Sequence, residues 1–473
     1  MKGCPNPCSS IDRGGMDNGY YAWMIVATAF VLMMTTPALA LFYGGMTRTK
    51  SVLNMMMMSF VAMGVVGIVF VLWGWSEGWG ADGAGNANGQ LIANPFHEFG
   101  LLHVSSSNFI YVLFQLTFAV ITVALISGSI ADRVKIGSWV VFCVLWVTLV
   151  YLPIAHNIWG GGWFAAHFPN LDYAGGTVVH INAGVAGGVL ALVIGRRSGW
   201  PRDVGRPHNL TLTMIGAGLL WTGWYGFNVG SIVFTSGSLS SSAKFTAQFQ
   251  GETGVTFLNT TIATMAAMLA WMLVERIRNG KATSLGAASG VVAGLVAITP
   301  SCGSVNTLGA LCIGAVAGAV CAVAVGLKYK VGLDDSLDVV GVHLTGGIIG
   351  ALLIGFFGTL LSPQGLDGLF PSGGGGLFYG GNATLLWHQF LGVVFTIVWC
   401  GVVTTLIGLA IKHTMGWRIK PEAEVEGIDY DQHGESAYDW GPSSGSHVVG
   451  ASPGSHVAGE SPGSHVVTEG ASP

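Results

Sequence analysis

The amino-acid sequence predicts an all-α integral membrane protein with eleven transmembrane helices. Of its 473 residues, 51% are hydrophobic and only 9% are charged, whereas soluble proteins carry about 25% charged residues. The hydrophobic residues gather into runs long enough to cross a bilayer, which takes about 20 mostly apolar residues per helix. The 73 glycines fit the same class, because small residues let membrane helices pack closely.

The apolar runs follow one another along most of the chain. Helices are expected because lipid leaves exposed backbone groups without hydrogen-bond partners, and the runs lack the alternation that marks a transmembrane strand. The predicted spans, in order, are 20–44, 54–76, 108–131, 138–160, 176–195, 209–233, 254–274, 284–301, 307–327, 339–361 and 385–411.

The basic residues predict the orientation of these spans. Lys and Arg gather in every second loop and in the segment after the last span, and loops of this kind face the cytoplasm. The opposite loops and the N-terminal segment hold only Lys2, Arg13 and Lys244. We therefore expect the N-terminus outside and the C-terminus in the cytoplasm, which requires an odd number of spans.

Spans 1–5 and spans 6–10 resemble each other. Span five contains, at its start, Gly-Gly-Thr-Val-Val-His (175–180), and span ten contains Asp-Val-Val-Gly-Val-His (338–343) at the equivalent place. Span one ends with Phe-Tyr-Gly-Gly at 42–45, and span six holds Trp-Tyr-Gly-Phe at 224–227. An odd number of spans per repeat inverts the second copy in the membrane. We expect inverted five-helix repeats, a substrate path at their interface, and an eleventh helix outside them.

The chain divides into four regions by composition. Residues 1–19 are expected to form an extracytoplasmic tail, and residues 20–413 form the membrane domain. Residues 414–440 are polar and aromatic and form a cytoplasmic tail. Residues 441–473 repeat Gly-Ser-His-Val between Ser, Gly and Pro. That last composition cannot bury a core, so we expect disorder there.

The N-terminal tail leaves two questions open. Met16 begins a segment that looks like a native start, so translation from Met16 is an alternative to translation from Met1. Cys4 and Cys8 could form a disulfide if the tail faces an oxidising compartment. A tail without a structural role is the simpler interpretation of this pair.

The sequence predicts no cofactor, metal site, enzyme activity or nucleic-acid partner. The seven cysteines lack metal-ligand spacing and there is no basic patch. His447, His456 and His465 could bind a metal weakly, but a solvated low-complexity repeat explains them better. No nucleophile lies beside a base in the pattern that an intramembrane hydrolase would need.

Two histidines lie inside predicted spans. An ionisable residue within a membrane is costly and marks a functional candidate. A single histidine there could simply be a core residue bonded to a neighbour. His180 and His343 occupy equivalent places in the two half-repeats, which favours a shared site at the repeat interface. Facing imidazoles can share one hydrogen bond, present polar edges to a small solute and relay a proton.

Aromatic residues cluster beside the same spans. Phe114 and Phe118 are four residues apart, as are Phe227 and Ser231, so each pair shares one helix face. Trp159 ends span four at the outer surface. Aromatic faces attract a small cation by about 2 kcal/mol or more once it is desolvated, and a hydroxyl adds a hydrogen-bond acceptor. For each aromatic alone, packing or interface anchoring is the more frequent role.

Acidic residues precede both histidine-bearing spans. Asp172 lies in the outer loop before span five, where it either caps the helix or recruits a cation. Asp334, Asp335 and Asp338 lie at the cytoplasmic start of span ten. Helix capping and stabilisation of the helix dipole explain this second group, which lacks the spacing of a calcium loop.

Several of these segments resemble the Amt, Mep and Rh family of ammonium transporters, specifically the bacterial-type Amt branch. The resemblance covers residues 20 to 440. The segments that carry it are Pro37–Gly45, Trp159–Gly162, Asp172–Gly184, Gly226–Ser231 and Asp338–His343.

The family resemblance implies a homotrimer with one pore in each subunit. By position, Trp159, Phe118 and Ser231 would form an outer cation site. Phe118 and Phe227 would form a stacked gate below it, and Asp172 would support recruitment of ammonium and the fold of the vestibule.

The resemblance also implies roles for the pore and the tail. His180 and His343 would be the twin pore histidines. Residues 424–429 and 433–438 resemble the family's cytoplasmic tail, which couples subunits and takes part in regulation by PII-type signalling proteins. The repeats after residue 440 are not part of the family pattern, so a PII-type protein is only a candidate partner.

The predicted function is transport of ammonium or ammonia across the plasma membrane. The chain is expected to lie in the lipid bilayer of that membrane as a multi-pass protein. Two alternatives stay open. One is an ammonium sensor that signals through the tail and conducts little. The other is a neutral gas channel for ammonia or carbon dioxide.

Overall fold

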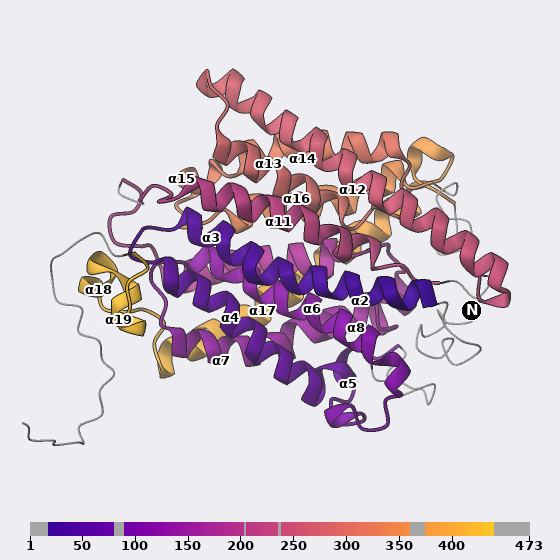
Figure 1. Ribbon diagram of the computed structural model, residues 1–473, viewed down its shortest axis with the longest axis horizontal. Coiled ribbons are helices and arrows are strands. Elements are labelled where there is room, and N and C mark those ends of the chain that lie inside the picture. Colours follow the sequence, from indigo (N-terminus) through magenta and orange to yellow (C-terminus); the bar gives the residue numbers. More distant parts are fainter. Residues whose placement is uncertain (1–17, 80–88, 203–204, 235–237, 360–373, 439–473) are drawn as a thin grey trace, which may run out of the picture. The chain divides into compact units, whose positions relative to one another are not determined.

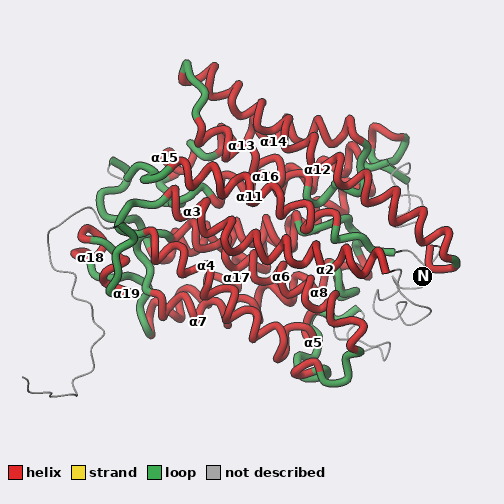
Figure 2. Tube along the Cα trace, viewed as in Figure 1, coloured by secondary structure: helices red, strands yellow, loops and turns green. Residues whose placement is uncertain are grey.

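The computed structural model describes residues 18–79, 89–202, 205–234, 238–359 and 374–438. Contacts divide the chain into Met1–Ala437 and Tyr438–Pro473, and every helix described below belongs to the first unit. The described residues form helices and loops without strands (Figure 2). The predictions for the start of the chain, for Cys4 and Cys8, and for the repeats at 441–473 concern residues outside these ranges.

The first half of the described chain corresponds to predicted spans one to five. Its elements include short π-helical turns (η1, η2, η6 and η7) inside longer helices. The main elements are α2 (Asn18–Met33), η1 (Met34–Leu39), α3 (Ala40–Met46), α4 (Val52–Val69), η2 (Phe70–Gly74), α5 (Trp75–Gly78), α6 (Phe109–Ile126), α7 (Ile136–Trp146), η6 (Val147–Tyr151), α8 (Leu152–Ile158), α9 (Trp163–His167), η7 (Gly176–Ile181) and α10 (Asn182–Ile194).

The second half corresponds to predicted spans six to eleven and a short tail. It again contains a π-helical turn, η9, at the start of predicted span ten. The main elements are α11 (Leu210–Val229), α12 (Ser242–Asn279), α13 (Ser284–Ile298), α14 (Thr307–Ala324), α15 (Leu327–Val331), η9 (Val340–Leu344), α16 (Thr345–Phe357), α17 (Ala383–Thr414), α18 (Pro421–Glu426) and α19 (Ile428–His433).

Each predicted span contains a helix, and nine helices of the described chain are long and apolar enough to cross a membrane. The chain is therefore a multi-pass membrane protein. Helix α13 is apolar but shorter, and α11 spans 20 residues without being among the nine.

One predicted boundary is wrong by a wide margin. The span expected at 254–274 is part of α12, which runs for 38 residues from Ser242 to Asn279. Its first turns contain Gln248 and Glu252, so the apolar pattern begins only after the helix has started. Hydropathy finds apolar runs, whereas the helix continues wherever neighbours satisfy its polar side chains.

The two halves meet through the turns that carry the predicted pore histidines. Turn η7 contacts η9, α10 packs on η9, and α16 packs on η7. Helix α11 lies beside α2 and α3, and α12 lies beside α13 and α14 (Figure 1). Each histidine-bearing turn therefore packs against the helix that follows its counterpart, as expected of an inverted repeat.

Glycine makes this close crossing possible at two equivalent positions. A Cβ atom on Gly184 would lie 2.6 Å from the Leu344 backbone nitrogen, and one on Gly347 would lie 3.0 Å from the Gly176 carbonyl oxygen. Each glycine lies four residues after a predicted pore histidine. Small residues at helix contacts let backbones approach in this way.

Helices α18 and α19 dock on loops of the membrane domain. The Asp429 carboxylate accepts hydrogen bonds from the backbone N–H groups of Leu53 (3.0 Å) and Asn54 (2.8 Å), in the first turn of α4. The Gln432 Oε1 atom accepts one from the backbone N–H of Ile136 (3.1 Å), the first residue of α7. Neither helix has a side-chain cap at its own N-cap position, so the tail supplies the missing acceptors.

Candidate functional site

Asp172 organises the backbone that leads to His180. Its carboxylate accepts hydrogen bonds from the backbone N–H groups of Gly175 (3.2 Å), Gly176 (2.5 Å), Thr177 (3.0 Å) and Val178 (3.1 Å), and from the Thr177 hydroxyl. The predicted capping role is thus confirmed. Burial raises the pKa of Asp172, although these hydrogen bonds act to lower it. Because the Asp172 carboxylate satisfies these backbone N–H groups, the first turn of η7 can begin inside the protein.

Asp335 does the same for the turn that carries His343. It accepts hydrogen bonds from the backbone N–H groups of Val339 (3.1 Å) and Val340 (2.8 Å) and from the Ser129 hydroxyl (2.7 Å). Asp335 lies eight residues before its histidine, as Asp172 does. The positions three residues after each aspartate, Gly175 and Asp338, both have positive φ angles, 117° and 62°.

The prediction that Asp334, Asp335 and Asp338 all serve as caps is only partly correct. Asp335 caps η9, but Asp334 forms an ion pair with Arg197 (2.8 Å) and Asp338 forms one with Lys328 (2.6 Å). Arg197 lies 137 residues from Asp334, and Lys328 lies ten residues from Asp338. Spacing within the aspartate cluster therefore could not distinguish an ion pair from a cap.

His180 and His343 face each other inside the protein. Their Nδ1 atoms are 3.3 Å apart, and the two residues are 1% and 4% exposed. A hydrogen bond between two Nδ1 atoms needs one protonated and one bare nitrogen. One ring then presents a bare Nε2 and the other an Nε2–H. The Nε2 atom of His180 has no hydrogen-bond partner among the described residues, so it is available to a small solute.

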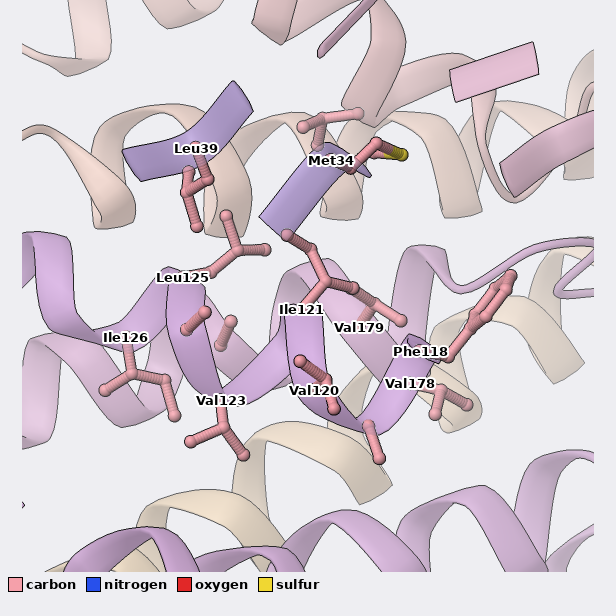
Figure 3. Close-up of a cluster of buried hydrophobic side chains, with 14 of the residues drawn as sticks. Met34, Leu39, Phe118, Val120, Ile121, Val123, Leu125, Ile126, Val178 and Val179 are labelled. Atoms are coloured by element: carbon pink, nitrogen blue, oxygen red, sulfur yellow. The ribbon is translucent and has the colours of Figure 1, made fainter. Parts of the chain in front are cut away.

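A mostly apolar cavity surrounds the two histidines. In Figure 3, Ile121 and Leu125 on α6 face Met34 and Leu39, with Val179 nearby. Nearly all polar contact within this cavity must come from the imidazole edges. Its lining consists of Met34, Leu39, Phe42, Tyr43, Ile121, Leu125, Val179, His180, Leu220, Trp224, Phe227, Val292 and His343.

Aromatic rings close the cavity on one side. The rings of Phe118 and Phe227 are stacked, with centroids 4.1 Å apart and planes 9° apart. Trp159 meets Phe118 edge to face at 6.0 Å, and Phe114 lies 4.9 Å from Phe118. Because the Phe227 ring is also 6.1 Å from His180, the rings form a path from Trp159 through the stacked pair to the histidines.

Ser231 lies beyond the end of its helix. The sequence placed it within a span at 209–233, but α11 ends at Val229. Its hydroxyl nevertheless donates to the Phe227 carbonyl (2.8 Å). The Ser231 hydroxyl proton is therefore already used in a hydrogen bond, and the hydroxyl oxygen can accept one from a solute. On the other side, the Trp159 Nε1–H donates to the Asp172 carbonyl (2.7 Å), which fixes the indole.

Trp224 contacts His180 but was not among the predicted site residues. Its ring is stacked on His180, with centroids 5.4 Å apart and planes 23° apart. Its Nε1–H donates to the Thr299 hydroxyl (2.8 Å). The signal was its place in the Trp-Tyr-Gly-Phe segment at 224–227, three residues before Phe227 on the same helix face.

The described residues contain no cluster of side chains that could bind a metal ion. Nowhere in residues 18–79, 89–202, 205–234, 238–359 and 374–438 do three or more His, Cys, Asp or Glu side chains gather to hold an ion. The groups that the site brings together are imidazoles, aromatic faces and one hydroxyl.

Comparisons with known proteins give matches along most of the chain. A family model described as Ammonium Transporter Family matches residues 22–438. An "Ammonium transporter" of Mycobacterium tuberculosis is 49% identical over 466 residues, 92% of this chain and 93% of the relative. The crystal structure of Saccharomyces cerevisiae Mep2 has a TM-score of 0.75 at 30% identity, covering 87% of this chain and 89% of that one. A structure titled "Sensor Amt Protein" has a TM-score of 0.75 at 24% identity, covering 88% and 98%, which is a likeness of fold alone.

Proposed function

The chain belongs to the ammonium transporter family, and on that premise we propose that it conducts ammonium or ammonia across the plasma membrane through a pore in each subunit. The observation that carries the proposal is the facing pair His180 and His343 inside an apolar cavity, 3.3 Å apart, below the stacked rings. The proposed topology has eleven spans, the N-terminus outside and the C-terminus in the cytoplasm. Because each subunit contains its own cavity, a homotrimer would hold three independent pores.

Recruitment occurs at the outer site in this proposal. The faces of Trp159 and Phe118 attract a cation, by about 2 kcal/mol or more where water is excluded. The Ser231 oxygen accepts a hydrogen bond, since its own proton is donated to Phe227. Ammonium can donate that bond and potassium cannot, which gives a basis for selectivity. Asp172 holds the surrounding backbone in place.

The stacked pair of Phe118 and Phe227 acts as the gate. At a centroid distance of 4.1 Å the rings leave no room between them, so they must separate for a solute to pass. A hydrated cation would pay a large desolvation penalty below this point. Ammonium therefore gives up a proton near Phe118 or is compensated by the histidines beyond it.

The histidine pair conducts the solute and its proton. One Nε2 accepts a hydrogen bond and the other donates one, which suits ammonia in both roles. When the bare Nε2 of one ring takes up a proton, that ring can pass its Nδ1 proton to the other ring, which releases its own Nε2 proton. Both rings then stay neutral with their roles reversed, so the pair can relay a proton. Transport that carries the proton along this route is electrogenic.

Two rival functions use the same architecture. A sensor would bind ammonium and report through the tail. Helix α19 of that tail contacts the first turns of α4 and α7, and the tail would be the docking surface for a PII-type protein. A neutral gas channel would pass ammonia without current. Curated relatives at up to 49% identity carry the name "Ammonium transporter", which favours transport over sensing.

Current on a solid-supported membrane tests the proposal. Proteoliposomes with the wild-type protein are expected to give an inward positive current on ammonium addition. His180→Ala and His343→Ala are expected to abolish it, because the polar link through the apolar cavity is lost, while the protein stays folded. His413→Ala, on an exposed histidine of α17, serves as the matched control and is expected to keep the current.

The outcomes separate the three functions. Unchanged current in both cavity variants would remove the histidines from the mechanism. A wild type without current, but with ammonia-driven pH change inside the liposomes, would indicate the gas channel. A folded wild type with neither signal would favour the sensor.

A further inference from the structure

Glu252 is a buried carboxylate on α12 that the predicted spans left out, since span seven was expected to begin at residue 254. The residue is 0% exposed, and it lies on a helix that is apolar enough to cross the membrane. Burying a carboxylate costs several kcal/mol unless donors surround it. An ionisable residue in such a place is by default a functional candidate.

Two side chains donate hydrogen bonds to Glu252, one to each oxygen. The Tyr173 hydroxyl donates to Oε1 (2.8 Å), and the Gln248 Nε2–H donates to Oε2 (2.7 Å). Tyr173 lies in the loop before η7, whereas Gln248 lies one turn earlier on α12. The carboxylate therefore joins two segments that are distant in the sequence.

Gln248 connects Glu252 to the segment that carries Ser231. Besides Glu252, the Gln248 Nε2 atom donates to the backbone carbonyl of Val233 (3.1 Å), two residues after Ser231. The Ser238 hydroxyl donates to the Gln248 Oε1 atom. This segment has left α11, which ends at Val229, so its position depends on such side-chain contacts rather than on helix geometry.

Tyr173 connects Glu252 to the segment that holds Trp159 in place. Tyr173 directly follows Asp172, whose carbonyl accepts the Trp159 Nε1–H (2.7 Å) and whose carboxylate caps η7. The Tyr173 backbone N–H also donates to the Pro300 carbonyl (3.1 Å). A shift of Tyr173 would thus move both the acceptor of the indole and the start of the histidine-bearing turn.

We propose that Glu252 is a positioning residue of the outer site, which sets the spacing between Ser231 on one side and Trp159 on the other. The inference rests on the proposed function, because it assigns Glu252 to the recognition of ammonium. Glu252 does not line the histidine cavity, so its effect falls on capture of the cation rather than on passage. A simple packing role would not require Glu252 to connect the Trp159 segment with the Ser231 segment. Its two hydrogen-bond partners, Tyr173 and Gln248, each contact or adjoin one of these segments.

Three variants each break one part of this link. Glu252→Gln keeps the volume and an acceptor for Tyr173, but its amide group cannot accept from Gln248. Tyr173→Phe removes the donor on the Trp159 side, and Gln248→Met removes the donor on the Ser231 side. Gln250→Met, on an exposed glutamine of the same helix, is the matched control.

Transport in proteoliposomes is measured against the ammonium concentration, together with competition by methylammonium. Each of the three variants is expected to raise the half-saturating ammonium concentration about fivefold, the effect of one lost hydrogen bond, with the maximal rate nearly unchanged. Tyr173→Phe and Gln248→Met are also expected to lower the unfolding midpoint, because each removes one donor to the buried carboxylate. The preference for ammonium over methylammonium is expected to fall, because the site is less closely spaced. Tyr173→Phe in the Glu252→Gln background is expected to add less than it does alone, since the two residues act through one link.

Every outcome bears on the inference. A maximal rate and unfolding midpoint that fall together, with half-saturation unchanged, would reduce Glu252 to a structural residue and overturn the proposal. Half-saturation equal to wild type in all three variants would overturn it as well, while leaving the proposed function intact. A wild type that carries no ammonium would overturn the proposed function and this inference with it. If Glu252→Gln does not fold, Tyr173→Phe and Gln248→Met carry the same test.

Discussion

The turns that carry His180 and His343 are built alike, yet their capping carboxylates have different surroundings. Asp172 is held by backbone N–H groups and one hydroxyl, without an ion pair to any residue in the described chain. Around Asp335, the Lys328 Nζ atom donates to the backbone carbonyl (2.8 Å) and further charges lie nearby. The same kind of cap therefore has neutral surroundings at the turn that carries His180 and charged surroundings at the turn that carries His343.

The charged setting is a buried network of ion pairs. Arg197 contacts Asp334 at 2.8 Å and Asp132 at 3.0 Å, and Arg133 lies 3.9 Å from Asp334. Burial lowers the pKa of Arg197, but the two carboxylates outweigh it and the net shift is upward. Loops rich in basic residues supply these partners. The comparison teaches that the two histidine-bearing turns share a local cap, whereas the loops around each turn decide how its end is stabilised.

The largest effect is expected at the charged end. Arg197→Met removes the partner of two buried carboxylates, and breaking a buried ion pair from one side costs about 3–5 kcal/mol. We expect a matching drop in the midpoint of heat- or denaturant-induced unfolding in detergent. Arg202→Met, on an exposed arginine five residues later, is expected to change stability by no more than about 0.5 kcal/mol. Equal midpoints for the two variants would show that the network adds nothing to this end.

The two caps themselves provide the next test. Asp172→Asn replaces one accepting oxygen by an NH₂ group that faces N–H donors, and Asp172 accepts five hydrogen bonds against three for Asp335. At about 1–3 kcal/mol for each unsatisfied buried group, we expect Asp172→Asn to cost on the order of 3 kcal/mol and Asp335→Asn less. Unfolding midpoints of the two variants measure the difference. A larger loss for Asp335→Asn would mean that the charged surroundings, rather than the cap, dominate.

The smallest effect is a dependence of stability on pH near pH 6, expected from Asp338 at the charged end. Burial raises the pKa of Asp338 to about 6, although Lys328 acts to lower it, whereas an unfolded aspartate has a pKa of about 3.9. Between these values the folded state binds more protons than the unfolded state, so the free energy of unfolding falls as the pH rises.

The Asp338 prediction is tested by comparing unfolding midpoints at pH 4 and pH 6.5. Between pH 4 and pH 6.5, the free energy of unfolding is expected to fall by about 1–2 kcal/mol less in Asp338→Asn than in the wild type. Asp431→Asn, on an exposed residue of α19, is expected to keep the wild-type pH dependence. Parallel curves for wild type and Asp338→Asn would remove Asp338 from the titration.

Sequence reasoning was most accurate where the physical cause is local. Apolar runs predicted a helix in each expected place, since lipid permits little else. It failed for α12, where buried contacts satisfy Gln248 and Glu252 and let the helix start twelve residues before the predicted boundary. It also placed Ser231 inside a helix that ends at Val229.

The candidate site divides in the same way. The matched segments of the half-repeats singled out His180 and His343. For Asp172, its place before a helix predicted a cap as one of two alternatives, and the hydrogen bonds of its carboxylate show that cap. Trp224 was missed although it lies in the matched segment at 224–227, because its stacking on His180 is a contact between residues far apart in the chain. Glu252 lies in no matched segment, and its hydrogen bond with Tyr173 leaves no pattern in the order of residues.

The sequence by itself determined the membrane class, the helices, the repeat and the family, because hydropathy, charge placement and motifs are properties of neighbouring residues. The tertiary structure alone decided that two Nδ1 atoms meet at 3.3 Å, that Phe118 and Phe227 stack and which charges pair with Asp334. These depend on contacts between residues far apart in the chain. Glycines at 184 and 347 allow the two halves to cross so closely, and the packing of whole helices then fixes every distance in the site.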